Sequence, residues 1–282
     1  MDLTGAAAAA VAKQGDEAAA EAAKTASRLW LSILQPSAEQ IGKDLLSRYQ
    51  NSRVQKVVAG ADRRNPSGSI PLRLAASVYE AASVSDEEVV SEYLSGILAS
   101  SRTGDGVNDA GMTWAGVVSR LPVNALRVHY LLSATVHVRK RGQGMNLGQM
   151  LQERVAFPTE VLTRYLVGLE VKGADDRSGS NDEPITAGIE ALTALQREGL
   201  VAEANWGPGN AIAGLFKTDD RVADWPYGFT CKLLPAGVSL LFWGLGLGRT
   251  SIGLYCSDVL DLKPLEDWTL PESMPELVFG VS

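Results

Sequence analysis

Apolar residues recur at helical spacing along most of this chain, and most regularly between residues 70 and 101. The segment IPLRLAASVYEAASVSDEEVVSEYLSGILASS carries two apolar stripes of helical period, separated by one short polar stretch. Pro71 fits the first position of the first helix, where a missing N–H costs nothing. Ser85 and Glu88 have the spacing of a capping box, so the second helix is expected to start there. The pattern predicts a helical hairpin with one buried seam and an architectural role.

Two further helices are predicted ahead of this hairpin. The first 35 residues are rich in alanine and predict a helix that frays up to about residue 15. After Pro36, residues 38 to about 64 combine an apolar stripe with an opposite face rich in cations. These cations are the candidate contacts to an acidic partner or to nucleic acid: Lys43, Arg48, Arg53, Lys56, Arg63 and Arg64. A solvated helix face is the simpler interpretation of the same pattern.

From Pro122 onward, strands are predicted among the helices. The predicted helices cover residues 123–138, 146–154, 158–169, 184–198 and 235–247, with a polar loop at 172–183. Strands are predicted at 200–204, 227–233 and 252–256. Gly199 is a good stop for the helix before the first strand, because glycine adopts the left-handed conformation that helix ends favour. The order helix, strand, loop, strand, helix is similar to that of a winged helix-turn-helix.

The predicted fold is therefore mainly α, with two parts. An N-terminal helical bundle over residues 1–121 precedes a winged-helix-like α+β domain over residues 122–250, which contains a small antiparallel β-hairpin. Residues 251–282 are expected to be irregular and to pack on the body through Trp268. The hydrophobic content of 45% over 282 residues is ample for a core. No apolar run approaches the roughly 20 residues that span a bilayer, so no membrane span is expected.

Charge is shared unevenly along the chain, whose net charge is −7. Residues 1–150 carry 16 Lys and Arg against 14 Asp and Glu, whereas residues 151–282 carry 10 against 19. The acidic second half repels phosphate at long range, which disfavours DNA binding by that half. The helix that would read DNA in a winged helix offers Thr186, Thr193, Gln196 and Arg197 against Glu190 and Glu198. A protein partner, or self-association through the long N-terminal helices, is the favoured interaction.

No familiar catalytic pattern is present in the sequence. It contains no P-loop, no GxSxG elbow, no HExxH and no CxxC pair, so no catalytic residue, cofactor or metal is predicted. His129 and His137 lie eight residues apart without a suitable carboxylate, and they are expected to be hydrogen-bonded or solvent-facing. Cys231 and Cys256, without a secretory signal pattern, predict a reduced cytoplasmic setting.

The order of elements resembles that of the abortive infection alpha (Abi-alpha) family of bacterial phage-defence proteins. The resemblance is carried by IGKDLLSRYQNSRVQKVVAGADRR (residues 41–64), by the hairpin of residues 70–101, and by the later LQREGLV and FTCKLLPAGVSLLF. It spans about residues 40–247. It implies a cytosolic bacterial protein of abortive infection, in which an infected cell stops growing before phage is released. It supplies no reaction and no catalytic residues.

Two classes of function remain open at this point. The first is a non-enzymatic sensor, effector or interaction module of phage defence, expected to be oligomeric. The second is a winged-helix DNA-binding transcriptional regulator, favoured by the basic face between Lys43 and Arg64 and disfavoured by the acidic second half.

Overall fold

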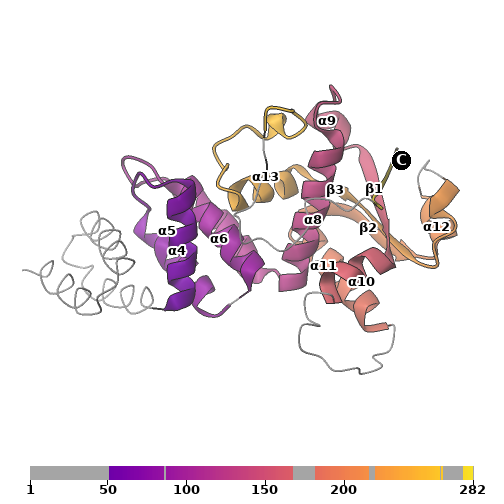
Figure 1. Ribbon diagram of the computed structural model, residues 1–282, viewed down its shortest axis with the longest axis horizontal. Coiled ribbons are helices and arrows are strands. Elements are labelled where there is room, and N and C mark those ends of the chain that lie inside the picture. The colour runs from indigo at the N-terminus through magenta and orange to yellow at the C-terminus, as the bar shows by residue number, and fades with distance from the viewer. Residues whose placement is uncertain are drawn as a thin grey trace, which may run out of the picture.

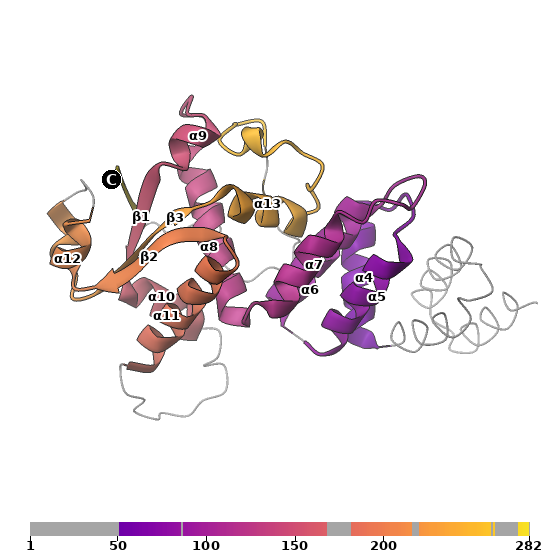
Figure 2. The same ribbon diagram turned by 180° about the vertical axis from the view of Figure 1, so that it is seen from behind.

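The computed structural model describes residues 51–85, 87–167, 182–215, 220–260, 262 and 276–281. This part is rich in helix and contains one small antiparallel sheet. In the described part, the helices between residues 52 and 120 lie at one end and the sheet lies toward the other. Helices α8 (Val123–Lys140) and α13 (Pro235–Gly244) lie between them (Figure 1, Figure 2). The predicted helix over the first 35 residues and the anchoring Trp268 lie outside the described residues.

Four consecutive helices pack together at the end of the described part that lies away from the sheet. They are α4 (Ser52–Arg64), α5 (Leu72–Ser83), α6 (Glu88–Ser101) and α7 (Gly111–Arg120). Each buries apolar residues at the predicted helical spacing. In α4 the buried residues are Val54, Val57, Val58, Gly60 and Ala61. The apolar pattern therefore located α5 and α6 correctly, and α4 in the last part of its predicted range.

The hairpin of α5 and α6 is confirmed, although its helix starts differ from the prediction. Pro71 has extended backbone and stands one position before α5, as its N-cap residue. The predicted capping box of Ser85 and Glu88 is wrong, because Glu87 is the N-cap residue of α6. The Ser85 hydroxyl instead accepts a hydrogen bond from the Glu87 amide at 3.3 Å. Ser85 thus closes a local turn before the helix begins.

The helix predicted over residues 38–64 is not continuous. Asn51 has extended backbone (φ −69°, ψ 127°), and its side chain accepts a hydrogen bond from the Arg53 amide at 2.9 Å. This is the geometry of an N-cap residue, so α4 starts at Ser52. The earlier part of the predicted helix lies outside the described residues.

Helix α6 is buried on every side. All its residues from Val89 to Ser101 are buried, and α4, α5, α7, α8 and α13 lie against it. The sequence predicted that the hairpin buries one seam between its helices. Instead, no side of α6 faces solvent. Gly96 permits the close approach of α13, because a Cβ atom there would lie 1.8 Å from the Gly244 carbonyl oxygen. Through this contact α6 joins the helical end of the molecule to the rest.

A hydrogen-bonded chain links α6, α8 and α13 at the centre. The Tyr93 hydroxyl lies 2.5 Å from His129 Nδ1, and His129 Nε2 lies 2.9 Å from the Gly237 carbonyl oxygen. A carbonyl oxygen only accepts, so Nε2 carries the proton and Nδ1 accepts from Tyr93. Burial lowers the pKa of His129 from 6.5 to about 4, which keeps the ring neutral. His137 is also buried, with Nδ1 2.5 Å from the Tyr255 carbonyl oxygen.

The second half of the chain builds a four-stranded sheet. The elements in order are α9 (Leu147–Met150), β1 (Glu153–Pro158), α10 (Thr159–Val167), α11 (Asp182–Arg197), β2 (Val201–Gly207), α12 (Gly209–Ala213), the 3-10 turn η3 (Asp220–Val222), β3 (Gly228–Leu233), α13, the 3-10 turn η4 (Ile252–Leu254) and β4 (Val278–Val281). The strand order is β2-β3-β1-β4, and every neighbouring pair is antiparallel.

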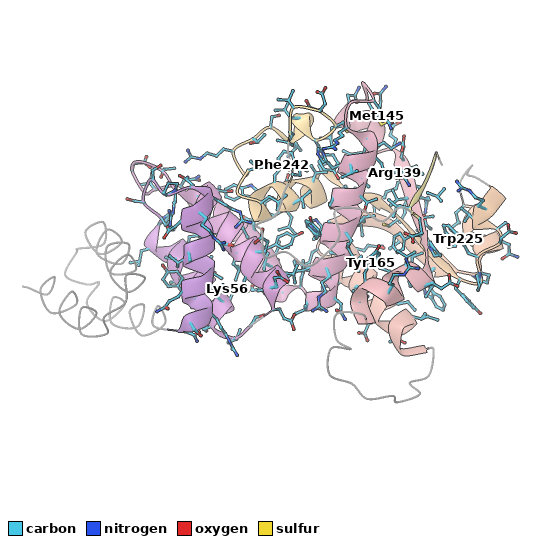
Figure 3. The ribbon with its side chains drawn as sticks, in the orientation of Figure 1. Lys56, Arg139, Met145, Tyr165, Trp225 and Phe242 are labelled. Atoms are coloured by element: carbon cyan, nitrogen blue, oxygen red, sulfur yellow. The ribbon has the colours of Figure 1, made fainter. Side chains whose placement is uncertain are left out.

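The two faces of the sheet have different covers. On one face Phe157 and Phe229 are directly opposed and stack at 5.8 Å between ring centroids. Helix α11 lies on this face, since a Cβ atom at Gly188 would come within 2.9 Å of the Phe229 ring. On the other face a small cluster of Ala156, Ile212 and Val222 forms, with Trp225 packed against it (Figure 3). The segment between β2 and β3 thus covers the face opposite α11.

The predicted strands at 200–204 and 227–233 are confirmed as β2 and β3. Gly199 ends α11 with a φ of +69°, and the Leu200 amide donates to the Leu195 carbonyl at 2.9 Å, as in a Schellman motif. The strand predicted at 252–256 is wrong, because the chain forms the 3-10 turn η4 there. Strands β1 and β4 were not predicted, and the helix predicted over 146–154 ends earlier, at Met150.

One hydrophobic core runs through both ends of the molecule. It extends from Val54 in α4 to Leu277 beside β4, so it is continuous across residue 121. The domain boundary expected there stays a prediction. None of the helices in the described ranges is long and apolar enough to cross a membrane.

Candidate interaction surface

The predicted basic face of α4 is smaller than its sequence indicates. Arg53 Nη1 donates to the Ser83 carbonyl oxygen at 3.2 Å, at the end of α5. Arg64 is buried and forms an ion pair with Glu92 of α6. Burial lowers the pKa of Arg64, and the Glu92 carboxylate opposes that effect. Both arginines are partly buried, and each bonds to a neighbouring helix.

Lys56, which is labelled in Figure 3, and Arg63 are the predicted candidate cations that α4 exposes to solvent. They lie seven residues apart, which places them on the same side of the helix. Lys43 and Arg48 lie outside the described residues. Within the described part, the candidate cationic surface is thus a pair of side chains rather than a stripe.

The solvent-facing side of helix α11, which we call its crest, is polar and carries nearly balanced charge. The exposed residues at helical spacing on this crest are Thr186, Glu190, Thr193 and Arg197. Arg197 Nε lies 3.6 Å from a Glu198 carboxylate oxygen, and the same carboxylate pairs with Arg120 of α7 at 2.7 Å. The Arg120 hydrogen bond is the main cause of the lowered pKa of Glu198. The crest therefore offers no excess of positive charge.

A partly apolar side of α11 faces the edge strand β2. The Gln196 side chain reaches the Ala204 amide of β2 at 3.1 Å, which fixes this side of the helix. Ile185 and Ile189 lie on the same side by helical spacing, and both are only partly buried. The border between helix and strand is therefore lined by aliphatic side chains that keep contact with water.

Two aromatic side chains are exposed at the far end of β2 and β3. Trp206 is 53% exposed and Tyr227 is 45% exposed. Trp206 is directly opposed to Phe229, so both project from the face that carries α11. The Thr159 amide donates to the Tyr227 carbonyl at 3.1 Å, which continues the ladder of β1 and β3 by one residue. Tyr227 stands at a bend directly before β3, next to the end of the strand that pairs with Trp206 and Gly207.

Together, Ile185, Ile189, Trp206 and Tyr227 form what we call the aromatic surface. Three carboxylates in the neighbouring segments of the chain are exposed: Glu160 at the start of α10, Glu190 on the crest of α11, and Asp224 in the segment that covers the opposite face of the sheet. Among the cations described in these segments, Arg164 pairs with Glu276, Arg197 lies close to Glu198, and Arg221 is exposed.

An ion cluster fixes the bulge in β2 beside this surface. The Glu203 carboxylate pairs with Arg154 of β1 and with Lys232 of β3, the latter at 2.9 Å. Glu203 has a φ of +51°, a left-handed conformation that costs a non-glycine residue of the order of 1 kcal/mol. The register of β2 and β3 shifts between Ala202 and Asn205 around it. The two cations hold a strained residue in place at the sheet edge.

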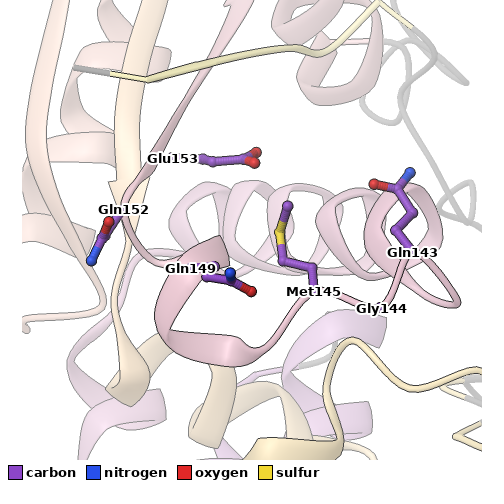
Figure 4. Close-up of a pocket in the computed structure, with 6 residues that line it drawn as sticks. All are labelled: Gln143, Gly144, Met145, Gln149, Gln152 and Glu153. Atoms are coloured by element: carbon purple, nitrogen blue, oxygen red, sulfur yellow. The ribbon is translucent and has the colours of Figure 1, made fainter.

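A shallow pocket lies beside α9, away from the aromatic surface. Its volume is about 370 Å³, and it is lined by Gln143, Gly144, Met145, Gln149, Gln152 and Glu153 (Figure 4). Glu153 and Met145 extend into the same space (Figure 4). Lys140 Nζ lies 2.5 Å from the Glu153 carboxylate and 4.3 Å from the centre of the Phe279 ring. The protein thus already neutralises the carboxylate, and the remaining polar lining is side-chain amides.

Neither cysteine thiol is activated for covalent chemistry. Burial raises the pKa of the Cys231 thiol to about 12, which keeps it protonated. The Cys256 thiol also has a raised pKa because of burial. Across the described ranges, no three His, Cys, Asp or Glu side chains gather as they would to hold a metal ion.

Comparisons with models of protein families, with curated proteins and with solved structures found no match.

The aromatic surface was not among the sequence-based candidates. Trp206 lies between the strands predicted at 200–204 and 227–233, and Tyr227 is the first residue of the second of them, so neither stands out in the sequence. The available signal was the pair of glycines, Gly207 and Gly228, beside the two aromatic residues at the strand ends. Gly207 and Gly228 are paired across β2 and β3 in the folded protein, and neither segment of the sequence predicts this pairing by itself.

Proposed function

We propose that this chain is a non-enzymatic interaction protein of bacterial phage defence, of the abortive-infection kind. Its working part would be a winged-helix-like unit that contacts protein rather than nucleic acid. The order α8, β1, α10, α11, β2, β3, with the strand order β2-β3-β1, supports the winged-helix interpretation of this unit. The resemblance of residues 41–64 and 70–101 to the Abi-alpha family supports the role in defence.

The observation that carries the proposal is the crest of α11. In a DNA-binding winged helix, the helix before the hairpin enters the major groove and needs cations and amides for phosphates and bases. Here Glu190 and Arg197 balance each other on the crest, and Arg197 is already close to the Glu198 carboxylate. A helix with this charge gains little from a phosphate backbone, so a protein surface is the better partner.

Phage plating with induced expression tests the defence role. Cells that express the chain are challenged with a panel of phages, and host survival is scored separately from phage yield. Abortive infection predicts a reduced phage yield together with reduced survival of infected cells. Equal phage yields with and without expression, across all phages tested, would remove the defence role.

A second candidate is a DNA-binding regulator, favoured by the same order of elements and by the exposed Lys56 and Arg63. It is tested by measuring DNA affinity against salt concentration, because phosphate contacts weaken steeply as salt rises. The informative variants are Lys56→Glu and Arg63→Glu. Changes at Arg53 or Arg64 would disturb helix packing as well, since both bind within the protein. Tight, salt-sensitive binding that these two variants abolish would replace the protein-interaction proposal.

A further inference from the structure

We propose that Arg154 and Lys232 form a binding site for a carboxylate or phosphate group, and that the Glu203 side chain occupies this site until such an anion displaces it. The inference goes beyond the proposed function and does not depend on it. It assigns a binding role to the bulge in β2.

The two cations stand side by side on one face of the sheet. The register of β1 and β3 places Arg154 opposite Lys232. Strand alternation puts Arg154 on the same face as Ala156, which is the face opposite α11. On its other side Arg154 is opposed to Gly280 of β4, which has no side chain to lay over it. The sheet itself therefore brings two positive charges together.

The contacts of Glu203 show what this pair of cations binds. Arg154 Nη2 and Lys232 Nζ both contact the Glu203 carboxylate, and the lysine contact is 2.9 Å long. Arg154 Nη1 also donates to the Glu203 carbonyl oxygen at 3.2 Å. Arginine binds carboxylate and phosphate strongly, because its planar guanidinium presents several donors to the oxygen atoms of one anion. The Glu203 carboxylate thus stands in for the group that an external ligand would supply.

The pair has more positive charge and more donors than Glu203 satisfies. Two cations face one carboxylate, and within the described ranges no other carboxylate forms an ion pair with either of them. The Arg154 side chain is only 7% exposed, and its Nε is buried without a hydrogen-bond partner among the described residues. A buried donor without an acceptor destabilises the folded protein. An anion that also reaches Nε would remove this cost.

The Glu203 side chain is more exposed than the cations that hold it, and its backbone is strained. The side chain is 45% exposed, so solutes reach its carboxylate. Its φ of +51° is the one positive value among the non-glycine residues of the described part. Strained backbone persists where the surrounding contacts hold it, and such positions cluster at binding sites and switches. Loss of the two cation contacts would let Glu203 leave the left-handed conformation, which favours its displacement.

Anion titration of a Glu203→Gly variant tests the inference. Glycine removes the carboxylate and accepts a positive φ without strain. The urea unfolding midpoint of the full-length protein is measured against rising acetate or inorganic phosphate, with chloride keeping the ionic strength constant. The midpoint of the variant should rise saturably, because a ligand of the folded state stabilises it. The wild type should respond with an apparent dissociation constant at least about tenfold higher, because its tethered carboxylate competes at a high effective concentration.

Two further variants test whether the response comes from this site. Adding Lys232→Met to Glu203→Gly should abolish the saturable rise, because it removes one of the two cations. Glu198→Ala is the matched control, since Glu198 also lies between two cations, Arg120 and Arg197, but these are 57% and 63% exposed. Its removal leaves no buried cation and should give no saturable rise. Should Glu203→Gly unfold, the wild type titrated beside Lys232→Met alone keeps the test valid.

Three results would each overturn the inference. They are equal anion affinities for the wild type and Glu203→Gly, a saturable rise that survives Lys232→Met, and the absence of a saturable rise in both proteins. A parallel titration with a triglutamate peptide distinguishes the sources of the anion. Tighter binding of the peptide than of acetate and phosphate identifies a carboxylate of a partner protein, whereas tighter binding of either small anion identifies a small-molecule ligand. Both of these outcomes support the site.

Discussion

Replacing His129 by glutamine is expected to remove a pH-dependent part of the stability of the protein. The folded protein keeps His129 neutral, since burial holds its pKa at about 4, whereas the unfolded chain takes up a proton near pH 6.5. Stability from this residue is therefore complete above pH 6.5 and is lost as the pH falls from 6.5 to about 4. At about 1.4 kcal/mol per pKa unit, the whole effect is about 3 kcal/mol.

Urea denaturation of the wild type and of His129→Gln, at several pH values between 7 and 4.5, measures this contribution. Glutamine has a donor for the Gly237 carbonyl and an acceptor for the Tyr93 hydroxyl, but it does not titrate in this range. The free energy of unfolding of the wild type should fall by about 2.5 kcal/mol more than that of the variant over this interval. The carboxylates and His137 are common to both proteins, so their titration cancels. Parallel curves for the two proteins would refute a buried, neutral His129.

Two further substitutions test the packing and the sheet edge. Gly96→Ala should lower the free energy of unfolding by about 3 kcal/mol, because its Cβ would meet the Gly244 carbonyl of α13. Gly116→Ala in α7, where the nearest atom is the mobile end of Arg120, should be neutral or raise stability by up to about 1 kcal/mol. Equal effects in thermal unfolding would contradict the close contact of α6 and α13. Glu203→Ala should cost about 2 kcal/mol, since it leaves the buried Arg154 without its carboxylate. Glu203→Gly should cost less than Ala by urea denaturation, because glycine relieves the strain at φ +51°; the reverse order would argue against that strain.

The helices could be predicted because their signals are local. Apolar spacing located α5, α6, α8, α11 and α13 and the last part of the helix that contains α4, and Gly199 marked the end of α11. The start of α6 was misplaced because two hydrogen-bonding arrangements suit the same residues. Ser85 can accept from the Glu88 amide in a capping box or from the Glu87 amide in a turn, and the surrounding packing favours the turn.

Strands β1 and β4 could not be predicted because their stability comes from pairing. The sequence LGQMLQERVAFP continues a helical pattern up to the strand, without a turn signal. Strand β1 forms because β3 and β4 supply partners on both sides, and β4 comes from more than 100 residues further along the chain. The sequence also does not show which cations of α4 are buried. Arg63 and Arg64 are equivalent in the sequence, and only the fold brings Glu92 beside Arg64.

The bulge at Glu203 also has a consequence for solubility. An edge strand that ends in an exposed tryptophan is a natural template for stacking one chain on another, and such strands nucleate aggregates. In β2 the Ala204 amide already bonds to the Gln196 side chain, and the backbone at Glu203 turns out of line. A strand of another chain that approached β2 would meet an irregular edge, at which the Ala204 N–H is already hydrogen-bonded. The protein can therefore display Trp206 to water on a strand that is a poor seed for aggregation.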